Sequence, residues 1–335
     1  MAIALFLILI VIHEFGHFIA AKLLGVRVNE FAVGFGPKLL SWGKGETKYA
    51  INLIPLGGYC AMEGEDEDST DERAFCRKKP WRRCLIVVMG ATFNLILGLV
   101  LVAITLIPEK RFATTTINSF HENATSVQSG LQEGDEIIAV DGRKIFTTYD
   151  LSYAFSNIDD GAIDITVKRN DKKIELKDVK FASEKFDDIN YLTVDFYVEG
   201  KEKTFLGFIE HTFDTTVSYC AVVYRSLIDL LTGRYGISAM SGPVGVTVAI
   251  GAVAKQNLNA LLRVMALITV NLGLFNLLPF PALDGGRLVF IVFEMIFKKP
   301  VPQKYESLVH AIGMALLLLF MALISIKDIW MLISG

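Results

Sequence analysis

Long apolar runs separated by polar stretches dominate the hydrophobic pattern of the 335-residue chain. The first run covers residues 2–12 and continues past two histidines to residue 24, which is long enough to cross about 30 Å of hydrocarbon. No basic segment precedes this run and no small-residue cleavage site follows it, so we expect a retained span rather than a signal peptide. Further runs at 85–107, 260–280 and 308–326 predict three more transmembrane helices.

Basic residues flank these runs on one side. Five of the seven residues at 77–83, directly before the second run, are Lys or Arg. The connection between the third and fourth runs is also basic, with Arg287, Lys298, Lys299 and Lys304. Because such clusters stay in the cytoplasm, we expect residues 22–84 to be cytoplasmic and both termini to lie outside, in a multi-pass protein of the cell (inner or cytoplasmic) membrane.

The segment between the second and third runs has a different pattern. Short alternating stretches at 136–140, 162–169 and 191–198 predict strands, and residues 149–157 have the spacing of a short helix. We therefore expect a compact α+β domain over residues 109–200, outside the cytoplasm.

Residues 201–258 fit neither the domain nor a span. The apolar face of 217–231 is interrupted by Arg225 and Asp229, so we expect an amphipathic helix that lies on the membrane rather than a fifth span. The Ser-Gly-Pro-Val-Gly sequence at 241–245 predicts a tight loop near the outer membrane face.

The predicted fold class is an α-helical membrane protein of about four transmembrane helices, with a membrane-associated β-hairpin region and one extracytoplasmic α+β domain. The expected parts are a first transmembrane helix at 1–24, a β region with a basic loop at 25–84, a second transmembrane helix at 85–108, the α+β domain at 109–200, a membrane-adjacent segment at 201–258, and the third and fourth transmembrane helices at 259–335.

Composition agrees with this division. The chain is 52% hydrophobic with a mean hydropathy of +0.45, which is typical of a membrane protein with a soluble insert. A formal net charge of −3 is too small to indicate a nucleic-acid partner. The four cysteines form no Cys-x-x-Cys pair, so we expect neither a disulfide framework nor a cysteine zinc site.

The first span carries the sequence His13-Glu14-Phe15-Gly16-His17, which has the His-Glu-x-x-His pattern of zinc proteases. On a helix His13 and His17 share one face and can reach one Zn²⁺, with Glu14 beside it as a general base. A chance match is the alternative for the motif alone. Burying an acid at the centre of a membrane costs about 2.5–3.5 kcal/mol on insertion scales, a cost that is tolerated when the groups bind something.

A catalytic zinc site needs a third protein ligand, and Asp284 is the best candidate. It follows the third span in a stretch that contains Asn276, two prolines and a pair of glycines. Such irregular backbone is tolerated near a membrane when it is buried or lines a wet cavity. The alternative is that Asp284 caps the helix that follows it. The two halves of the site are expected at a similar depth, because the first and third spans both run inward.

The His-Glu-x-x-His motif, the α+β insert and the Asn-x-x-Pro-x-Pro-x-x-Asp-Gly sequence at 276–285 together resemble the site-two protease family. The bacterial RseP/RasP-type branch of this family, an intramembrane zinc metalloprotease, is the most similar. The resemblance covers nearly the whole chain. Supporting segments are those at 34–37, 54–59 and 241–245, and residues 131–142, which resemble a PDZ signature.

The resemblance implies that His13, His17 and Asp284 hold Zn²⁺ and that Glu14 activates water. It also implies that Asn276 holds the substrate backbone. The glycines Gly34, Gly36, Gly57 and Gly58, together with Tyr59, would belong to a membrane-entering β-structure that pairs with an unwound substrate strand.

By the same resemblance, the substrates would be single-span membrane proteins within the lipid bilayer, such as anti-sigma factors or signal-peptide remnants, trimmed first by an upstream site-one-type protease. Only one PDZ-like copy fits residues 109–200, and we expect it to filter access by size. The alternative function is a membrane scaffold, or a metal or proton transporter-like protein with a PDZ-like binding module. Glu14 favours the protease, because a transporter needs ligands but no base.

Overall fold

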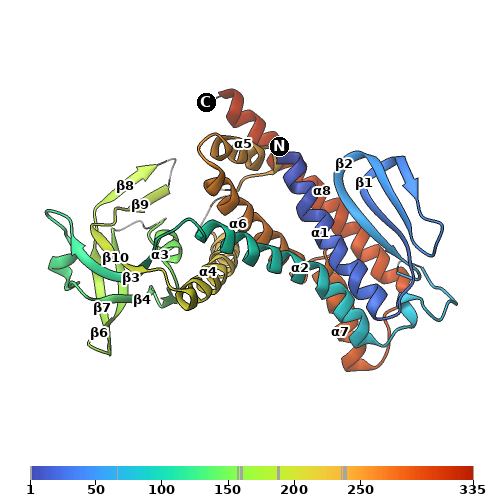
Figure 1. Ribbon diagram of the computed structural model, residues 1–335, viewed down its shortest axis with the longest axis horizontal. Coiled ribbons are helices and arrows are strands. Elements are labelled where there is room, and N and C mark those ends of the chain that lie inside the picture. Colours follow the sequence, from blue (N-terminus) through green and yellow to red (C-terminus); the bar gives the residue numbers. More distant parts are fainter. Residues whose placement is uncertain are drawn as a thin grey trace. The chain divides into compact units, whose positions relative to one another are not determined.

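The chain forms two compact units in the computed structural model, which describes residues 2–334 apart from 66, 157, 159–160, 187–188, 235 and 237–239. The first unit combines Met1–Leu101 with Met240–Gly335, and the second is Val102–Ala239. Most elements of both units are labelled in Figure 1.

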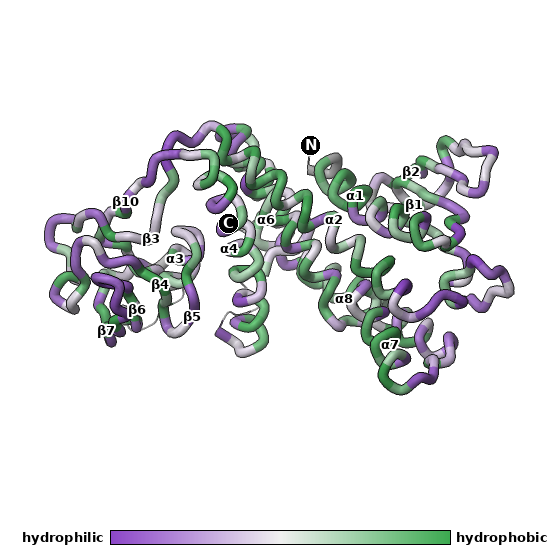
Figure 2. Tube along the Cα trace, turned by 60° about the horizontal axis from the view of Figure 1, so that its bottom comes forward, coloured by the Kyte–Doolittle hydropathy of each residue, from purple (hydrophilic) through white to green (hydrophobic). Residues whose placement is uncertain are grey.

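Helices make up most of the first unit, and Figure 2 shows that they are hydrophobic along most of their length. Within the described residues, four segments are long and apolar enough to cross a membrane: Leu5–Leu23, Pro80–Leu106, Leu258–Asn276 and Gln303–Ile333. This confirms the four predicted spans. The helices of the unit are α1 (Ala2–Leu23), α2 (Pro80–Leu106), α5 (Pro243–Ala254), α6 (Leu258–Asn276), α7 (Asp284–Phe297) and α8 (Gln303–Ser334).

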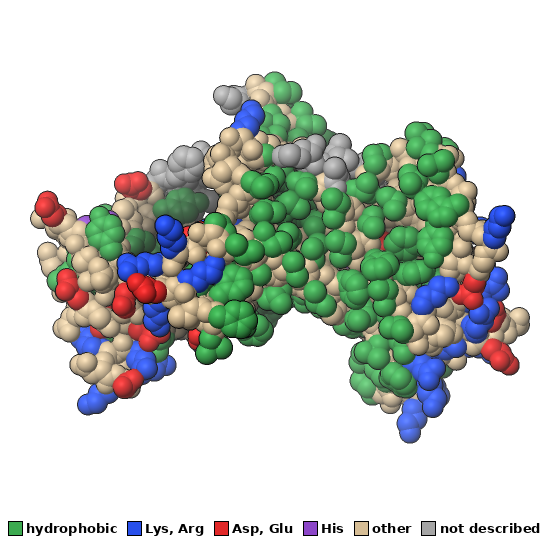
Figure 3. Space-filling model, viewed as in Figure 1, with side chains coloured by type: hydrophobic (Ala, Val, Ile, Leu, Met, Phe, Trp, Pro, Cys, Tyr) green, Lys and Arg blue, Asp and Glu red, His purple; other side chains and the backbone are tan. Residues whose placement is uncertain are grey.

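The outer surface of these helices is apolar. In α8 only 11% of the most apolar 18-residue stretch is buried, and large side chains such as Leu308, Leu316 and Leu323 are exposed. Figure 3 shows hydrophobic side chains over most of the helical unit, with Lys and Arg gathered near the end of α7. A surface of this kind is solvated by lipid rather than water, and the chain is a multi-pass membrane protein.

A small β-sheet packs against α1, beside it in Figure 1. It consists of β1 (Val28–Trp42) and β2 (Lys48–Met62), which are antiparallel and both bent, so that each contributes two segments. Across the sheet, the order of the paired segments is 38–42, 49–52, 30–33 and 58–61. The last segment of β2 is therefore an edge of the sheet, and the predicted β-hairpin region is present.

The carboxylate of Asp328 in α8 binds the N-terminus of the short apolar helix α5 by hydrogen bonds. Asp328 is 6% exposed and accepts hydrogen bonds from the backbone N–H groups of Gly242 (2.9 Å) and Gly245 (2.8 Å). These donors belong to the first turn of α5, where the helix offers them no acceptor. Added Cβ atoms on the two glycines would lie 3.0 Å from Asp328 Oδ2, so both must be small.

This contact corrects two expectations from the sequence. The break at 241–245 is the start of a helix, with Gly242 as N-cap and Pro243 in the first turn. The fourth span was expected to end at residue 326, but α8 continues past Asp328 to Ser334. The buried carboxylate is tolerated there because α5 supplies its hydrogen bonds.

The second unit is an α+β domain followed by a long helix. Its main sheet has the order β10-β3-β4-β6-β7, and β5 pairs with β4. The side chains of Ile137, Ile165 and Val167 lie in its core. The elements are β3 (Arg111–Phe120), β4 (Glu136–Val140), β5 (Arg143–Lys144), α3 (Thr148–Ala154), β6 (Ala162–Arg169), β7 (Lys172–Lys180), β8 (Ser183–Phe186), β9 (Ile189–Leu192), β10 (Phe196–Glu202) and α4 (Phe205–Leu231).

Two predicted strands, at 136–140 and 162–169, match β4 and β6. The third, at 191–198, was wrong as one strand: β9 ends at Leu192 and β10 begins at Phe196. Between them, Asp195 turns to accept hydrogen bonds from the Ser126 hydroxyl and backbone N–H. The predicted helix at 149–157 is shorter, and its residue 157 lies outside the described residues.

The helix α4 is longer than predicted, and two of its charged residues, Arg225 and Asp229, face the domain. Arg143 donates two hydrogen bonds to Asp229, at 2.8 and 2.6 Å, and Arg225 donates one to the fully buried Asp150. Burial alone would raise the pKa of Asp229, but the hydrogen bonds from Arg143 and Tyr153 lower it below its usual value. Apart from Glu210, the exposed side of α4 is mainly apolar, with Phe205, Leu206, Ile209, Phe213, Tyr224, Ile228 and Leu231.

The contact between α5 and α8 makes a testable contribution to stability. Replacing Asp328 by Ala leaves the N–H groups of the buried Gly242 and the part-buried Gly245 without this acceptor, and we expect a loss of about 1–3 kcal/mol in the free energy of unfolding. The matched Asp328→Asn variant keeps an acceptor oxygen and should lose less. Thermal unfolding in detergent measures both, and an Ala variant as stable as wild type would contradict the assignment.

Candidate metal centre

The histidines of the site are held where α1 packs closely against α2. His13 and His17 are one helical turn apart on α1, and each is 7% exposed. Two glycines allow the close approach: a Cβ on Gly16 would overlap the backbone of Met89, and one on Gly90 would overlap the His17 ring. The space left by Gly90 is therefore occupied by the imidazoles.

The carboxylate of the site comes from the other end of the chain. The helix α6 ends at Asn276, and α7 begins at Asp284 after a loop with two prolines. Side chains at Gly285 or Gly286 would overlap the carbonyl oxygens of Leu278 and Phe280, so the loop can fold back tightly only with glycine there. This turn directs Asp284 toward α1.

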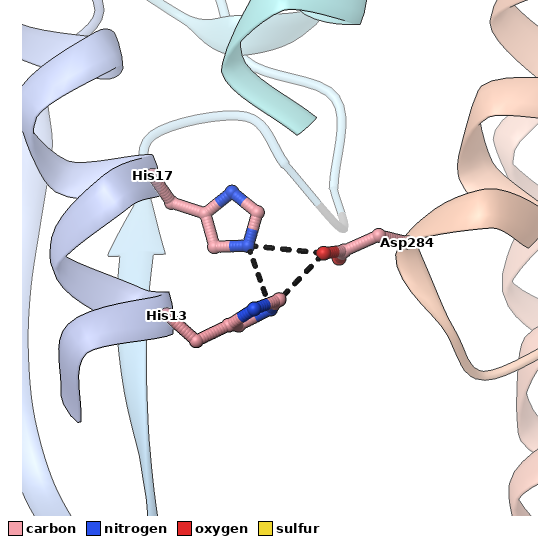
Figure 4. Close-up of side chains that lie close together, drawn as sticks. All are labelled: His13, His17 and Asp284. Carbon is pink, nitrogen blue, oxygen red and sulfur yellow. Dashed lines mark hydrogen bonds and ion pairs between the residues drawn. The ribbon is translucent and has the colours of Figure 1, made fainter. Parts of the chain in front are cut away.

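The three side chains converge, as Figure 4 shows. Asp284 Oδ2 lies 3.1 Å from His13 Nε2 and 3.2 Å from His17 Nε2, and the two Nε2 atoms are 3.2 Å apart. Among the described residues, this is the one group of His, Cys, Asp and Glu side chains found close enough to hold a metal ion.

This geometry fits a zinc ion. Bonds of about 2.0–2.1 Å in a tetrahedral shell place neighbouring ligand atoms about 3.3 Å apart. Asp284 Oδ2 is buried and receives no hydrogen bond, which a metal would explain. The alternative role of Asp284 as a helix cap is wrong, because the N-cap of α7 is Leu283 and no side chain caps this helix.

Both imidazoles have partners behind them in α2. His17 Nδ1 lies 2.9 Å from the carbonyl oxygen of Ile86, so Nδ1 carries the proton and Nε2 is free to bind a metal. His13 Nδ1 lies 3.3 Å from the Asn94 amide nitrogen and 3.4 Å from that of Asn276.

A cavity of about 610 Å³ opens beside the site. Glu14, His17 and Asp284 line it, as do residues 59–62 of β2 and side chains of α7 and α8. The ion pair between Glu65 and Arg287 lies in its wall. The cavity can therefore hold a peptide segment and water next to a carboxylate and a metal.

The predicted substrate-binding residues divide into two groups. Asn276 lies beside His13, Tyr59 lines the cavity, and a Cβ on Gly58 would lie 3.6 Å from Glu14 Cγ. In contrast, Gly34, Gly36 and Gly57 shape the bends of the sheet. All three have positive φ, and added Cβ atoms would meet Ile54 or the Phe35 ring.

Comparison with known proteins gives one consistent result. Residues 1–320 match peptidase family M50. A protein of Clostridium perfringens is 36% identical over 329 residues, covering 98% of this chain and 97% of its own. A protein of Clostridium acetobutylicum is 36% identical over 336 residues, with 98% and 96% covered. Both carry the provisional name of zinc metalloprotease.

The chain belongs to peptidase family M50. This confirms the resemblance to the site-two proteases, and with it a membrane-bound zinc metalloprotease. A third relative, from Fusobacterium nucleatum subsp. nucleatum, is 30% identical over 347 residues, covers 99% of this chain and bears the same provisional name. The similarity extends across both units and is not confined to the metal centre.

Sequence reasoning missed the residues that support the ligands. Gly90 is one of several glycines in apolar helices, and nothing local distinguishes it. The Ile86 carbonyl is a backbone group and carries no sequence signal at all. Asn94 is visible in the sequence as a polar residue within the second apolar run, but its partner is 81 residues away on another helix.

Removing any one ligand should remove the metal. We expect the purified protein to contain one zinc per chain, and His13→Ala, His17→Ala and Asp284→Ala to contain less than about a tenth as much, because two ligands hold zinc weakly. Elemental analysis after dialysis measures the content. His121→Ala, an exposed histidine of the second unit, is the control, and a ligand variant with full zinc would contradict the site.

Proposed function

We propose that the protein is a zinc-dependent intramembrane endopeptidase that cleaves single-span membrane proteins. The observation that carries this proposal is the position of His13, Glu14 and His17 inside α1, a helix long and apolar enough to span a membrane. A hydrolytic site built within such a helix acts on bonds at membrane depth rather than on soluble peptides.

In the proposed mechanism the chain supplies a general base, a side-chain amide that holds the substrate backbone, and the cavity beside the metal centre. When bound, zinc supplies a Lewis acid that acidifies water and polarises a peptide carbonyl. Glu14 lines the cavity with His17 and Asp284, and its carboxylate takes a proton from the attacking water and passes it to the leaving amine. Asn276, part-buried at the end of α6, holds the substrate backbone by its side-chain amide.

The edge segment of β2 is the proposed docking strand for the substrate. A transmembrane helix hides its peptide bonds in internal hydrogen bonds, so it must unwind before cleavage. Residues 58–61 pair on one side with 30–33, and residues 59–62 line the cavity. Strand addition at this edge replaces the hydrogen bonds that the substrate loses and brings its backbone beside Glu14.

The second unit is proposed as an extracytoplasmic, PDZ-like access filter on the membrane. Both of its ends continue into the membrane unit, and α4 exposes a mainly apolar face while its Arg225 and Asp229 bind the domain. Such a face fits the lipid interface.

In intact cells an impermeant maleimide should label Lys172→Cys of this unit but not Lys299→Cys after α7, and the reverse labelling would contradict this topology.

The proposed substrates are those that an access filter would admit: single-span proteins already shortened outside by a site-one-type protease. Anti-sigma factors and signal-peptide remnants are the two classes that fit, and cleavage of the former would constitute regulated intramembrane proteolysis in the cell membrane. A scaffold or transporter would need the ligands but not Glu14, whose place in the cavity wall favours the protease.

The role of Glu14 can be separated from metal binding. Glu14→Gln removes the base but keeps the shape of the side chain, so we expect cleavage of a single-span substrate to fall by at least about 100-fold. Zinc content should remain at the wild-type level, because Glu14 is not one of the three ligands. Cleavage of a purified substrate in detergent, with and without a chelator, is the measurement. A zinc-loaded variant as active as wild type would refute this mechanism.

Substrate pairing with β2 predicts a specific cross-link. In Glu14→Gln protein whose four cysteines are changed to serine, Ala61→Cys should form a disulfide with a substrate cysteine near the cleaved bond, since residue 61 lines the cavity. The control is Leu40→Cys, which is exposed on the opposite edge of the same sheet. Equal cross-linking at both positions, or none at 61, would count against the docking strand.

A further inference from the structure

Asn94 is a fully buried polar side chain of α2 that the proposed reaction does not use. It is 0% exposed, so it cannot contact a substrate. Its amide nitrogen lies 3.3 Å from His13 Nδ1, and its Oδ1 atom is buried without a hydrogen-bond partner. A buried polar group in this position needs a role.

The metal centre requires one tautomer of His13. The Nε2 atom faces Asp284 at 3.1 Å and His17 at 3.2 Å, so Nε2 is the ligand and must be unprotonated. Neutral imidazole then carries its proton on Nδ1, which needs an acceptor. An amide nitrogen cannot accept this proton, but the amide oxygen can, and a half-turn of the Asn94 amide exchanges the two atoms.

We propose that Asn94 Oδ1 accepts a hydrogen bond from His13 Nδ1–H and thereby holds His13 in the tautomer that binds zinc through Nε2. Asn94 is then a positioning residue that acts through His13. It is the counterpart of the Ile86 carbonyl, which accepts from His17 Nδ1 at 2.9 Å. The helix α2 thus orients both histidines of α1, one by a backbone oxygen and one by a side-chain oxygen.

Asn276 does not fill this role. Its amide nitrogen is 3.4 Å from both Nδ1 and Nε2 of His13, so it does not select one tautomer over the other. Asn94 is confined, because α6 packs against it at Gly273, where an added Cβ would lie 3.3 Å from Asn94 Cβ. The inference rests on the metal centre and is independent of which substrate the enzyme cleaves.

The test is zinc affinity without substrate, measured by competition with a chelator in detergent. Asn94→Leu keeps the approximate shape but has no acceptor, and we expect its zinc affinity to fall about 10–100-fold. Asn94→Asp keeps an acceptor, and its affinity should stay at or above the wild-type value. The control is Asn271→Leu, which makes the same change at an exposed asparagine of α6. Wild-type affinity in Asn94→Leu, or an equal loss in Asn94→Asp, would overturn the proposal.

A second measurement decides the matter even if a variant does not fold. In wild-type protein labelled with ¹⁵N-histidine, the resonances that shift on zinc loading are expected from His13 and His17, two of the five histidines of the chain, so no variant is needed. The proposal requires a proton on Nδ1 that is shielded from exchange by its hydrogen bond. A freely exchanging Nδ1 proton would contradict it.

Discussion

The structure depends on the convergence of one carboxylate and two imidazoles inside a bundle of apolar helices. Isolated polar groups at this depth cost several kcal/mol each, and repulsion or unmet hydrogen bonding would drive them apart. A metal bound between them offsets this free-energy cost, since the lone pair of each ligand atom then has a partner. The glycines where α1 meets α2, and those after Asp284, are explained by this requirement, because they let the backbone come close enough for the three ligand atoms to meet.

The second constraint is that the bond to be cut must be accessible beside this site. The β-sheet next to α1 provides an edge strand, and the same cavity contains that edge, Glu14 and two of the ligands. A sheet edge is normally a liability, because its unpaired N–H and C=O groups invite association. In a protease whose substrates arrive as helices, the proposed use of that edge is to receive an unwound segment.

Local sequence signals predicted the elements that depend on local chemistry. The spacing of His13 and His17 placed them on one helix face, and the prolines and glycines around Asp284 indicated a turn that could deliver a third ligand. The four spans followed from long, mainly apolar runs. These signals work because helix periodicity and membrane thickness act within one segment.

Features that depend on distant partners were not predictable in the same way. In the sequence, Arg225 and Asp229 interrupt an apolar face, whereas in the structure Asp150 and Arg143 of the domain neutralise them. The fourth apolar run ends at residue 326, yet α8 continues through Asp328, because α5 supplies the hydrogen bonds of this carboxylate from more than 80 residues away. A charge in a helix is ambiguous until its partner is known, and a single sequence does not name that partner.

The most direct test of the central claim is zinc-edge X-ray absorption on the purified protein. The account predicts two imidazole nitrogens and light oxygen or nitrogen neighbours at about 2.0–2.2 Å, with no sulfur. In Asp284→Cys it predicts one sulfur at about 2.3 Å, because the new thiolate would occupy the position of the carboxylate. Sulfur in the wild-type shell, or an unchanged shell in the variant, would show that the metal is not held by His13, His17 and Asp284.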